Sequence, residues 1–266
     1  SQKKRYMLSA QLSYDITDWL NISGRVRVDN THTKYEQKLY ASSNLTITEE
    51  STQGHYTISK PDETQTYADV LANINKRFND FSLVANVGAS IVNNRYEDLS
   101  YRGPIREKGI PNVFNVFDLD NTKKKARQDE WQEQTQSVFA SVEVGWKSML
   151  YLTLTGRNDW ASQLANSSTP CFFYPSVGLS GVISEMLTLP EFIDYMKVRG
   201  SFSSVGMPYP RNLTSPTYEY DEANQQWKPK THYPIKDLKP ERTNSWELGL
   251  DMRLFKDFSL GFSWYL

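Results

Sequence analysis

The sequence predicts an all-β fold of about ten antiparallel strands, because apolar and polar side chains alternate along much of its 266 residues. The clearest stretch is 131–146, where every second residue from Val138 to Trp146 is apolar. The positions between them carry mainly polar side chains, such as Ser137, Ser141 and Glu143. Successive side chains of a strand point to opposite faces, so this stretch has one apolar and one polar face.

The next segment repeats the pattern and forms a hairpin with the first. Leu150, Leu152 and Leu154 alternate with polar residues, and only the short Lys147-Ser148 link lies between the two segments. The same arrangement recurs near the C-terminus, where 246–254 and 258–264 flank another short link. The same criterion predicts six further strands, at 8–14, 20–28, 68–74, 81–91, 175–183 and 196–202.

Alternation alone fits both a membrane barrel and a soluble sandwich. The lengths of the links between strands distinguish these two kinds of β-protein. Short links fall near 17–18, 79–80, 147–148 and 256–257, with 185–194 as a longer member of this set. Long links span 38–62, 99–130, 163–171 and 207–241, and short and long links alternate strictly. Outer-membrane barrels have this asymmetry between periplasmic turns and extracellular loops. Trp19, Phe81 and Trp146 beside short links are typical of an interfacial aromatic belt.

The composition excludes several classes of protein. Lys and Arg total 30 against 31 Asp and Glu, so no nucleic-acid-binding surface is indicated. Cys171 is the only cysteine, which excludes an internal disulfide and a Cys-based zinc site. No apolar run reaches the roughly 18 residues of a transmembrane helix. The negative mean hydropathy is compatible with a membrane barrel, because only every second residue of each strand meets lipid.

Four ordered motifs lie in the second half of the chain. The first is Gly156-Arg157-Asn158-Asp159-Trp160, and the second, at 172–185, reads FFYPSVGLSGVISE. The third, at 197–206, reads KVRGSFSSVG, and the fourth, at 238–251, reads LKPERTNSWELGLD. In sequence and order they resemble the barrel of the SusC/RagA family of TonB-linked outer-membrane proteins from Bacteroidetes. Upstream of Trp131 the resemblance is one of strand pattern alone.

This resemblance implies a TonB-dependent receptor in the cell outer membrane of a Gram-negative bacterium, with a plug domain inside a barrel of about 22 strands. It implies import of nutrient fragments, glycan oligosaccharides or peptides, with a SusD-like surface lipoprotein as lid. The energy would come from the TonB complex, which contacts the N-terminal region of such proteins. We therefore expect residues 1–266 to be a partial barrel domain without plug domain or signal peptide, which transports only as part of the whole barrel.

No enzymatic site is predicted. Glu247 and Asp251 share the polar face of one strand, but four residues at about 3.3 Å each separate their backbones by about 13 Å. This exceeds the carboxyl spacing of about 5–9.5 Å that glycosidases use. Arg157 and Asp159 lie about 6.6 Å apart along another polar face, and we interpret all four residues as a lumenal charge network. The three histidines show no ligand spacing, so neither a metal nor a cofactor is predicted.

The long loops are where substrate would meet this chain, because barrels vary their function through loops on a rigid scaffold. The loop at 207–241 carries five aromatic residues that could stack on sugar rings or hold peptide side chains: Tyr209, Tyr218, Tyr220, Trp227 and Tyr233. We predict that they contact substrate or the lid lipoprotein. The alternative is that they pack this loop against its neighbours.

Two other functions remain open. A passive outer-membrane porin or adhesin barrel would lack a plug and energy coupling, whereas a soluble carbohydrate-binding β-sandwich would bury the apolar stripe as a closed core. The importer hypothesis places four apolar residues against lipid: Val142, Leu152, Leu250 and Met252. It places their polar neighbours toward a wet lumen: Ser141, Thr153, Glu247 and Asp251.

Overall fold

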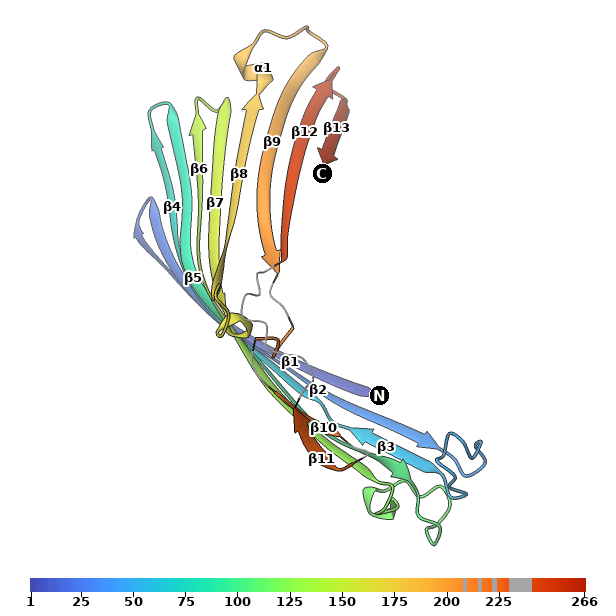
Figure 1. Cartoon of the computed structure of the whole chain (residues 1–266). Coiled ribbons are helices and arrows are strands. Elements are labelled where there is room, and N and C mark those ends of the chain that lie inside the picture. Colours follow the sequence, from blue (N-terminus) through green and yellow to red (C-terminus); the bar gives the residue numbers. More distant parts are fainter. Residues whose placement is uncertain (208–209, 215–216, 222–223, 230–240) are drawn as a thin grey trace.

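One antiparallel sheet of 11 strands dominates the protein (Figure 1). The computed structural model describes residues 1–207, 210–214, 217–221, 224–229 and 241–266. Neighbouring strands are antiparallel, and most of them are consecutive in the chain, so the predicted all-β, antiparallel fold is confirmed. The strands of the sheet are β1 Gln2–Thr17, β2 Leu20–Leu39, β3 His55–Ser59, β4 Asp62–Phe78, β5 Phe81–Pro104, β6 Lys125–Trp146, β7 Leu150–Ala161, β8 Cys171–Val182, β9 Ile193–Met207, β12 Glu241–Leu254 and β13 Phe258–Tyr265.

Smaller elements lie in the links between these strands. A separate two-stranded sheet consists of β10 Tyr218–Asp221 and β11 Gln226–Pro229. The helical elements are η1 Val116–Asp118, η2 Ser162–Leu164 and α1 Ile183–Met186. Within the sheet, β3 and β4 both lie between β2 and β5, so these two strands together fill one position. Lys60 and Pro61 interrupt that position, and Pro61 has no N–H to donate to a ladder.

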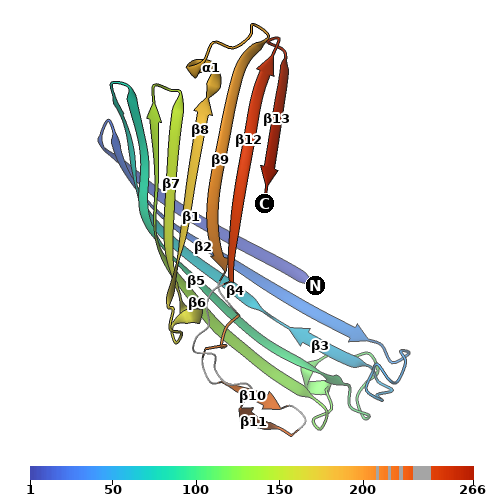
Figure 2. The same cartoon turned by 45° about the horizontal axis from the view of Figure 1, so that its top comes forward.

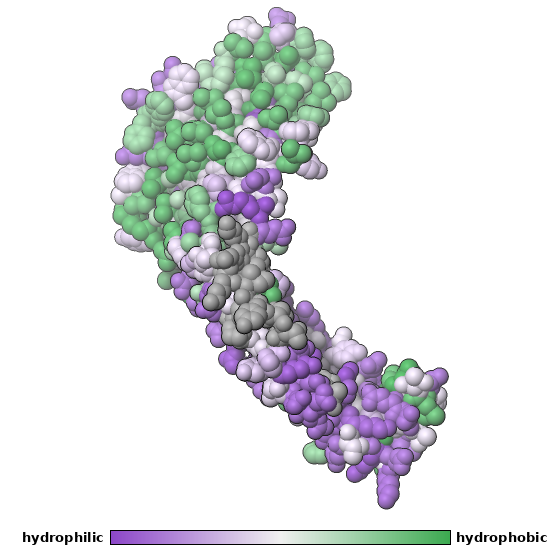
Figure 3. Space-filling model, viewed as in Figure 1, coloured by the Kyte–Doolittle hydropathy of each residue, from purple (hydrophilic) through white to green (hydrophobic). Residues whose placement is uncertain are grey.

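The strand register aligns the apolar faces of neighbouring strands. Leu154 on β7 lies opposite Val142 on β6 and Val177 on β8. Toward the C-terminus, Leu250 on β12 lies opposite Val198 on β9. Directly paired residues of antiparallel strands point to the same face, so the apolar stripes of single strands join into one continuous surface. Figure 3 shows hydrophobic residues over the half of the molecule that contains the short turns, and mainly hydrophilic residues over the other half.

The apolar surface has the height of a bilayer. On β5 the apolar positions run from Phe81 to Ile91, and the same face then carries Asn93, Arg95 and Glu97. Ten residue steps cover about 33 Å along the strand, which a tilt of about 40° reduces to a height of about 25 Å. The apolar band of outer-membrane barrels is about this tall. The rest of β5, from Val92 onward, therefore extends beyond the band.

The short and long links lie at opposite ends of the sheet, as predicted. The turns that follow β1, β4, β6 and β12, and the link containing α1, lie at the end drawn uppermost in Figures 1 and 2. The links at 40–54 and 105–124 lie at the opposite end. Asn79 adopts a left-handed φ of 48° in the two-residue turn between β4 and β5, a conformation that Asn tolerates better than most residues.

Several predicted boundaries are wrong in the same direction. We predicted loops at 38–62 and 99–130, but β2 continues to Leu39, β5 to Pro104, and β6 begins at Lys125. Beyond the apolar band both faces of a strand meet water, so the sequence loses the alternation that reveals strands. The segment predicted as the 207–241 loop contains the β10–β11 hairpin.

In the described residues, no helix has the length and apolar character needed to span a bilayer.

A labelling experiment tests the assignment of the two faces of the sheet. Leu152 is paired with Val144 and Leu179, whereas Thr153 is paired with Glu143 and Gly178. In full-length protein with Cys171→Ser, we expect Thr153→Cys to react with a water-soluble thiol reagent in intact outer membranes. Leu152→Cys should react only with a lipid-phase reagent, and equal aqueous labelling of both would contradict the assignment.

Candidate functional site

A groove of about 920 Å³ lies between the outer part of β6 and the β10–β11 hairpin. Figures 1 and 2 show this hairpin beside the half of the sheet that carries the long links. We call this site the aromatic groove, because most of its large side chains are aromatic. Its walls include Tyr96, Trp131, Arg211, Tyr218, Tyr220 and Trp227. The groove lies outside the apolar band, where water-borne molecules can enter it.

A three-layer stack forms one wall of the groove. Tyr96 on β5 and Trp131 on β6 are directly paired, and their rings stack with centroids 5.4 Å apart. The guanidinium of Arg211 lies over the Trp131 ring, 3.7 Å from its centroid. One Arg211 nitrogen also donates to Glu133 at 2.8 Å, which holds the guanidinium in place. Stacking, cation–π attraction and the ion pair together make this wall rigid.

The hairpin supplies the opposite wall. Tyr220 and Trp227 are paired across β10 and β11, and their rings meet edge to face with centroids 5.3 Å apart. Tyr218 and Trp227 leave 68% and 69% of their surface exposed, so their ring faces are free for a ligand. The structure thus brings three of the five predicted loop aromatics to the groove, while Tyr209 and Tyr233 lie outside the described residues.

Tyr96, on one wall of the groove, lies near several carboxylates. Burial raises the pKa of Tyr96 above its ordinary value, and the charges of Asp98, Asp129 and Glu63 raise that pKa further. Arg127 opposes them, but its Nε is paired with Asp129 at 2.7 Å. Burial and the three carboxylates therefore both favour the neutral form of the Tyr96 phenol.

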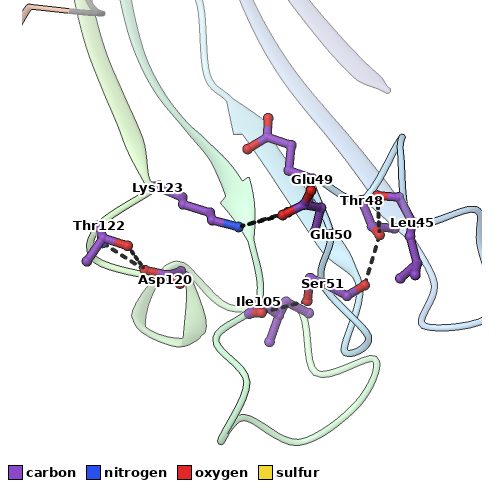
Figure 4. Close-up of polar contacts among 9 residues, drawn as sticks. All are labelled: Leu45, Thr48, Glu49, Glu50, Ser51, Ile105, Asp120, Thr122 and Lys123. Carbon is purple, nitrogen blue, oxygen red and sulfur yellow. Dashed lines mark hydrogen bonds and ion pairs between the residues drawn. The ribbon is translucent and has the colours of Figure 1, made fainter.

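The link between β2 and β3 and the link between β5 and β6 pack together into what we call the outer cap, residues 40–54 and 105–124 (Figure 4). The side chains of Ile105 and Leu119 are 1% exposed and form its core. Ser51 Oγ donates to the Ile105 carbonyl at 2.7 Å, and Lys123 Nζ donates to the Glu49 carbonyl at 3.2 Å. The cap therefore connects the end of β5 to the start of β6, the strand that carries the groove wall.

The predicted charged residues form two separate clusters on the polar face. Arg157 Nε donates to Asp159 at 2.7 Å, and the Arg157 guanidinium also donates to Ser137 Oγ at 2.8 Å. Asp159 is 8% exposed, and Ser137 is 2% exposed. These side chains are directly paired across β6 and β7, so the strand register places the charge cluster.

The comparisons with known proteins decide the family. The family model described as "TonB dependent receptor-like, beta-barrel" matches residues 1–266, the whole chain. This protein belongs to the TonB-dependent receptor β-barrel family. Such barrels lie in the outer membrane, so the apolar band of this TonB-dependent receptor barrel faces lipid there. The sequence matches none of the curated proteins with which it was compared.

Solved structures with the same fold include two structures of the RagAB peptide importer. The structure titled "Structure of the RagAB peptide transporter" superposes with a TM-score of 0.78 at 16% identity, and the RagAB peptide importer in the "open-open" state gives 0.76 at 16%. Both matches cover 99% of this chain and 30% of the other chain. The siderophore receptor PiuA from Acinetobacter baumannii gives 0.58 at 14%, covering 99% of this chain and 40% of that one. This receptor barrel segment therefore spans about a third of the length of its structural relatives.

Arg199 is a charged residue of this receptor barrel that the sequence analysis missed. It lies between Glu247 and Asp251, 3.1 Å from the first and 3.6 Å from the second. Its side chain crosses Gly249, where any Cβ would collide with it. The glycine between two same-face carboxylates was the available signal, since it leaves space for a long cation from the paired strand.

Trp131, Tyr96 and Arg211 were also missed as groove residues. Trp131 was assigned to a strand, and the direct pairing of Tyr96 with Trp131 appears only once the register is fixed. Arg211 precedes the hairpin and has no sequence motif. Among the described residues, no group of three His, Cys, Asp or Glu side chains could hold a metal ion.

Proposed function

We propose that this chain is part of a TonB-dependent importer that carries nutrient fragments, oligosaccharides or peptides, across the outer membrane. The aromatic groove is the observation that supports this proposal. It opens beyond the apolar band on the side of the long loops, where a substrate arriving from outside meets the barrel first. Exposed rings such as Tyr218 and Trp227 can stack on a sugar ring or hold a peptide side chain.

The proposal includes two protein partners. A SusD-like surface lipoprotein would cover the long loops as a lid, and the TonB complex would supply energy through the N-terminal region of the whole protein. The RagAB structures are titled as a peptide importer in "open-open" and "closed-closed" states, which supports a mechanism in which the assembly opens and closes. Because the receptor barrel segment spans only part of such a protein, both partners belong to the proposal.

The polar face would form part of the lumen wall in this importer. Arg157 and Asp159 would make up one part of a lumenal charge network, and Glu247 and Asp251 the other. Arg199 holds both carboxylates of the second cluster, which supports a structural role in place of acid–base chemistry. We therefore propose a transport function for the chain and no enzymatic one.

The two alternatives are weaker. A soluble sandwich requires the apolar stripe to be covered by a second packed sheet. Leu154 and Leu248 lie on the apolar face of a single-layer sheet and are 47% and 56% exposed, so the sandwich hypothesis is wrong for the described residues. A passive porin or adhesin is disfavoured because the family that matches is one of TonB-dependent receptors.

Trp227→Ala in the full-length protein tests the role of the groove. We expect uptake of substrate to fall and its apparent affinity to weaken about tenfold, because truncation of a central aromatic contact costs about 1.4 kcal/mol. The measurement is growth of a strain that relies on this protein, supplied with either mixed peptides or mixed oligosaccharides. Phe117→Ala is the matched control, since Phe117 is an even more exposed aromatic that lies in the outer cap. Unchanged uptake in Trp227→Ala would contradict a substrate role for the groove.

A further inference from the structure

A second groove lies on the apolar face of the sheet. It has a volume of about 650 Å³ and crosses the strands from β1 to β7. Gly24, Ala68 and Ala89 form its floor, because their side chains are small, and larger residues such as Val26 and Val138 stand beside them. We call this site the membrane groove. It lies within the apolar band, so its occupant must come from the membrane.

The membrane groove is inclined to the bilayer. The outermost apolar residue of this face is Val28 on β2, Ile91 on β5 and Val138 on β6. Ile91 lies in the same row of paired residues as Val26, one side-chain step below Val28. Val138 is paired with Ala89, one further step below Ile91. A row of paired residues therefore rises toward the outer surface from β2 to β6, and the groove follows such rows.

The groove covers the depth of one leaflet. It extends from Leu12 on β1, through β2, β4, β5 and β6, to Trp160 on β7. Five strand spacings amount to about 24 Å. Because strands tilt by about 40°, a row lies about 50° from the bilayer normal and covers about 15 Å of depth, which is half of the hydrocarbon core of about 30 Å. An acyl chain of the outer leaflet therefore matches the groove, with Trp160 at the head-group end.

Neutral hydrogen-bonding side chains surround that outer end. Gln136 is directly paired with Trp160, and the next outward pair on this face is Asn93 with Gln134. Gln136 donates to Gln134 at 3.2 Å, and Gln132 donates to Asn93 at 2.8 Å. Each carboxamide has two N–H donors and an acceptor oxygen, so further donors and acceptors remain for a ligand. We call Asn93, Gln132, Gln134 and Gln136 the amide shelf.

The charges beyond the amide shelf disfavour a phosphate head group. Arg95 is the one cation that the described outer parts of β4, β5 and β6 turn to this face, and it is paired with Glu97. Glu97 also lies directly between Asp62 on β4 and Glu130 on β6, which makes a row of three carboxylates. A phosphate would meet this row without an unpaired cation on these strands. Sugar hydroxyls can exchange hydrogen bonds with neutral amides and need no cation.

We infer that the membrane groove binds a glycolipid of the outer leaflet, with one acyl chain along Gly24, Ala68 and Ala89 and its sugar on the amide shelf. Trp160 is 43% exposed, so its ring can stack on the sugar. The inference goes beyond the proposed import function, because this site lies on the lipid-facing side of the sheet and needs no imported substrate.

Native mass spectrometry of the full-length protein in detergent tests the inference, with one lipid added at a time. The three lipids have identical saturated chains and are a glucosyl diacylglycerol, a diacylglycerol and a phosphatidic acid. We expect the glucosyl lipid to bind about tenfold more tightly than the other two, as two hydrogen bonds to a neutral head group would provide. Equal binding of all three lipids, or tightest binding of the phosphatidic acid, would overturn the inference.

Ala68→Phe tests the place of the acyl chain. Its ring would fill the groove, so we expect the glucosyl lipid to bind about tenfold more weakly. Ala72→Phe is the matched control, because Ala72 lies on the same strand and face, one side-chain step beyond Val70 and outside the groove lining. An equal effect of both variants would contradict a chain site at Ala68.

Asn93→Ala combined with Gln134→Ala tests the amide shelf. These positions lie beyond the apolar band, so the double variant should assemble even if Ala68→Phe does not. We expect it to remove the preference for the glucosyl lipid and to leave binding of the diacylglycerol unchanged. Gln128→Ala is the control, since Gln128 points to the same face, six residues from Gln134 and farther from the groove. An unchanged preference in the double variant would overturn the inference.

Discussion

Leu154→Arg should destabilise the folded barrel in the outer membrane by about 2–4 kcal/mol, the cost of a cation on the lipid face near the bilayer midplane. Leu154 lies opposite Val142, which in turn lies opposite Ala85, halfway along the apolar run from Phe81 to Ile91. It is 47% exposed on a single-layer sheet, so no protein group covers it. An arginine there would have to extend about half the height of the band to reach water.

The neighbouring Thr155→Arg is the matched control. Thr155 points to the opposite face and is paired with Ser141 and Ser176, so an arginine there enters polar surroundings. The measurement is the fraction of full-length protein that is assembled in the outer membrane and resists unfolding by SDS without heating. We expect this fraction to fall sharply for Leu154→Arg and to change little for Thr155→Arg. A similar loss for both variants would show that the faces do not differ, and the lipid assignment would be wrong.

The sequence predicts this fold well within the apolar band. There, each strand meets lipid on one side and polar groups on the other. Apolar and polar side chains therefore alternate along the sequence with a period of two. Segments such as 81–91 and 131–146 were recognised for this reason, and so were the tight turns between them. The pattern also excludes a one-residue slip of the register, because that slip would place Val142 beside a polar residue of β7 and interrupt the apolar face.

Beyond the band the same logic fails. The outer parts of β5 and β6 are paired over residues such as Arg95 with Gln132 and Glu97 with Glu130, with polar side chains on both faces. Such strands are stabilised by their ladder hydrogen bonds and carry no alternation. The core of the outer cap could not be predicted either, since Ile105 and Leu119 are 14 positions apart in a link without strands.

The candidate site was predictable only in part. Composition alone pointed to the aromatic loop, because a cluster of Tyr and Trp in a long polar link is unusual. The partners of that loop lie on β5, β6 and the segment before β10, and only the folded chain brings Tyr96, Trp131 and Arg211 to it. The pairing of charged side chains in the groove could not be predicted from the sequence either, because the ion pair between Arg211 and Glu133 joins residues 78 positions apart.

Ile105→Ala should destabilise the outer cap by about 2–5 kcal/mol, the usual cost of removing a fully buried isoleucine side chain down to its Cβ. Ile105 is 1% exposed and faces Leu119, which is equally buried. Its backbone is bound on both sides, since its N–H donates to Gly54 and its carbonyl accepts from Ser51. A cavity at this point therefore loosens both links of the cap together.

Limited proteolysis of the full-length protein measures this effect. Cleavage within 40–54 and 105–124 should accelerate about 30-fold or more if it tracks the population of the opened cap, since 2 kcal/mol corresponds to that factor. The barrel should remain resistant to SDS, because the cap lies outside the apolar band and can open locally. Phe117→Ala is the control, since Phe117 is 88% exposed in the same link. Equal cleavage of both variants would mean that Ile105 does not hold the cap closed.

The same variant connects the cap to the groove. The link at 105–124 leads directly into β6, whose residues from Ala126 to Trp131 form one wall of the aromatic groove. Opening of the cap releases the constraint on this end of β6 and leaves only its pairing with β5 to hold the wall. We therefore expect Ile105→Ala to weaken ligand binding in the groove without touching any groove residue, while Phe117→Ala leaves the affinity unchanged. A groove that keeps its full affinity in Ile105→Ala would show that pairing with β5 is sufficient to fix the wall.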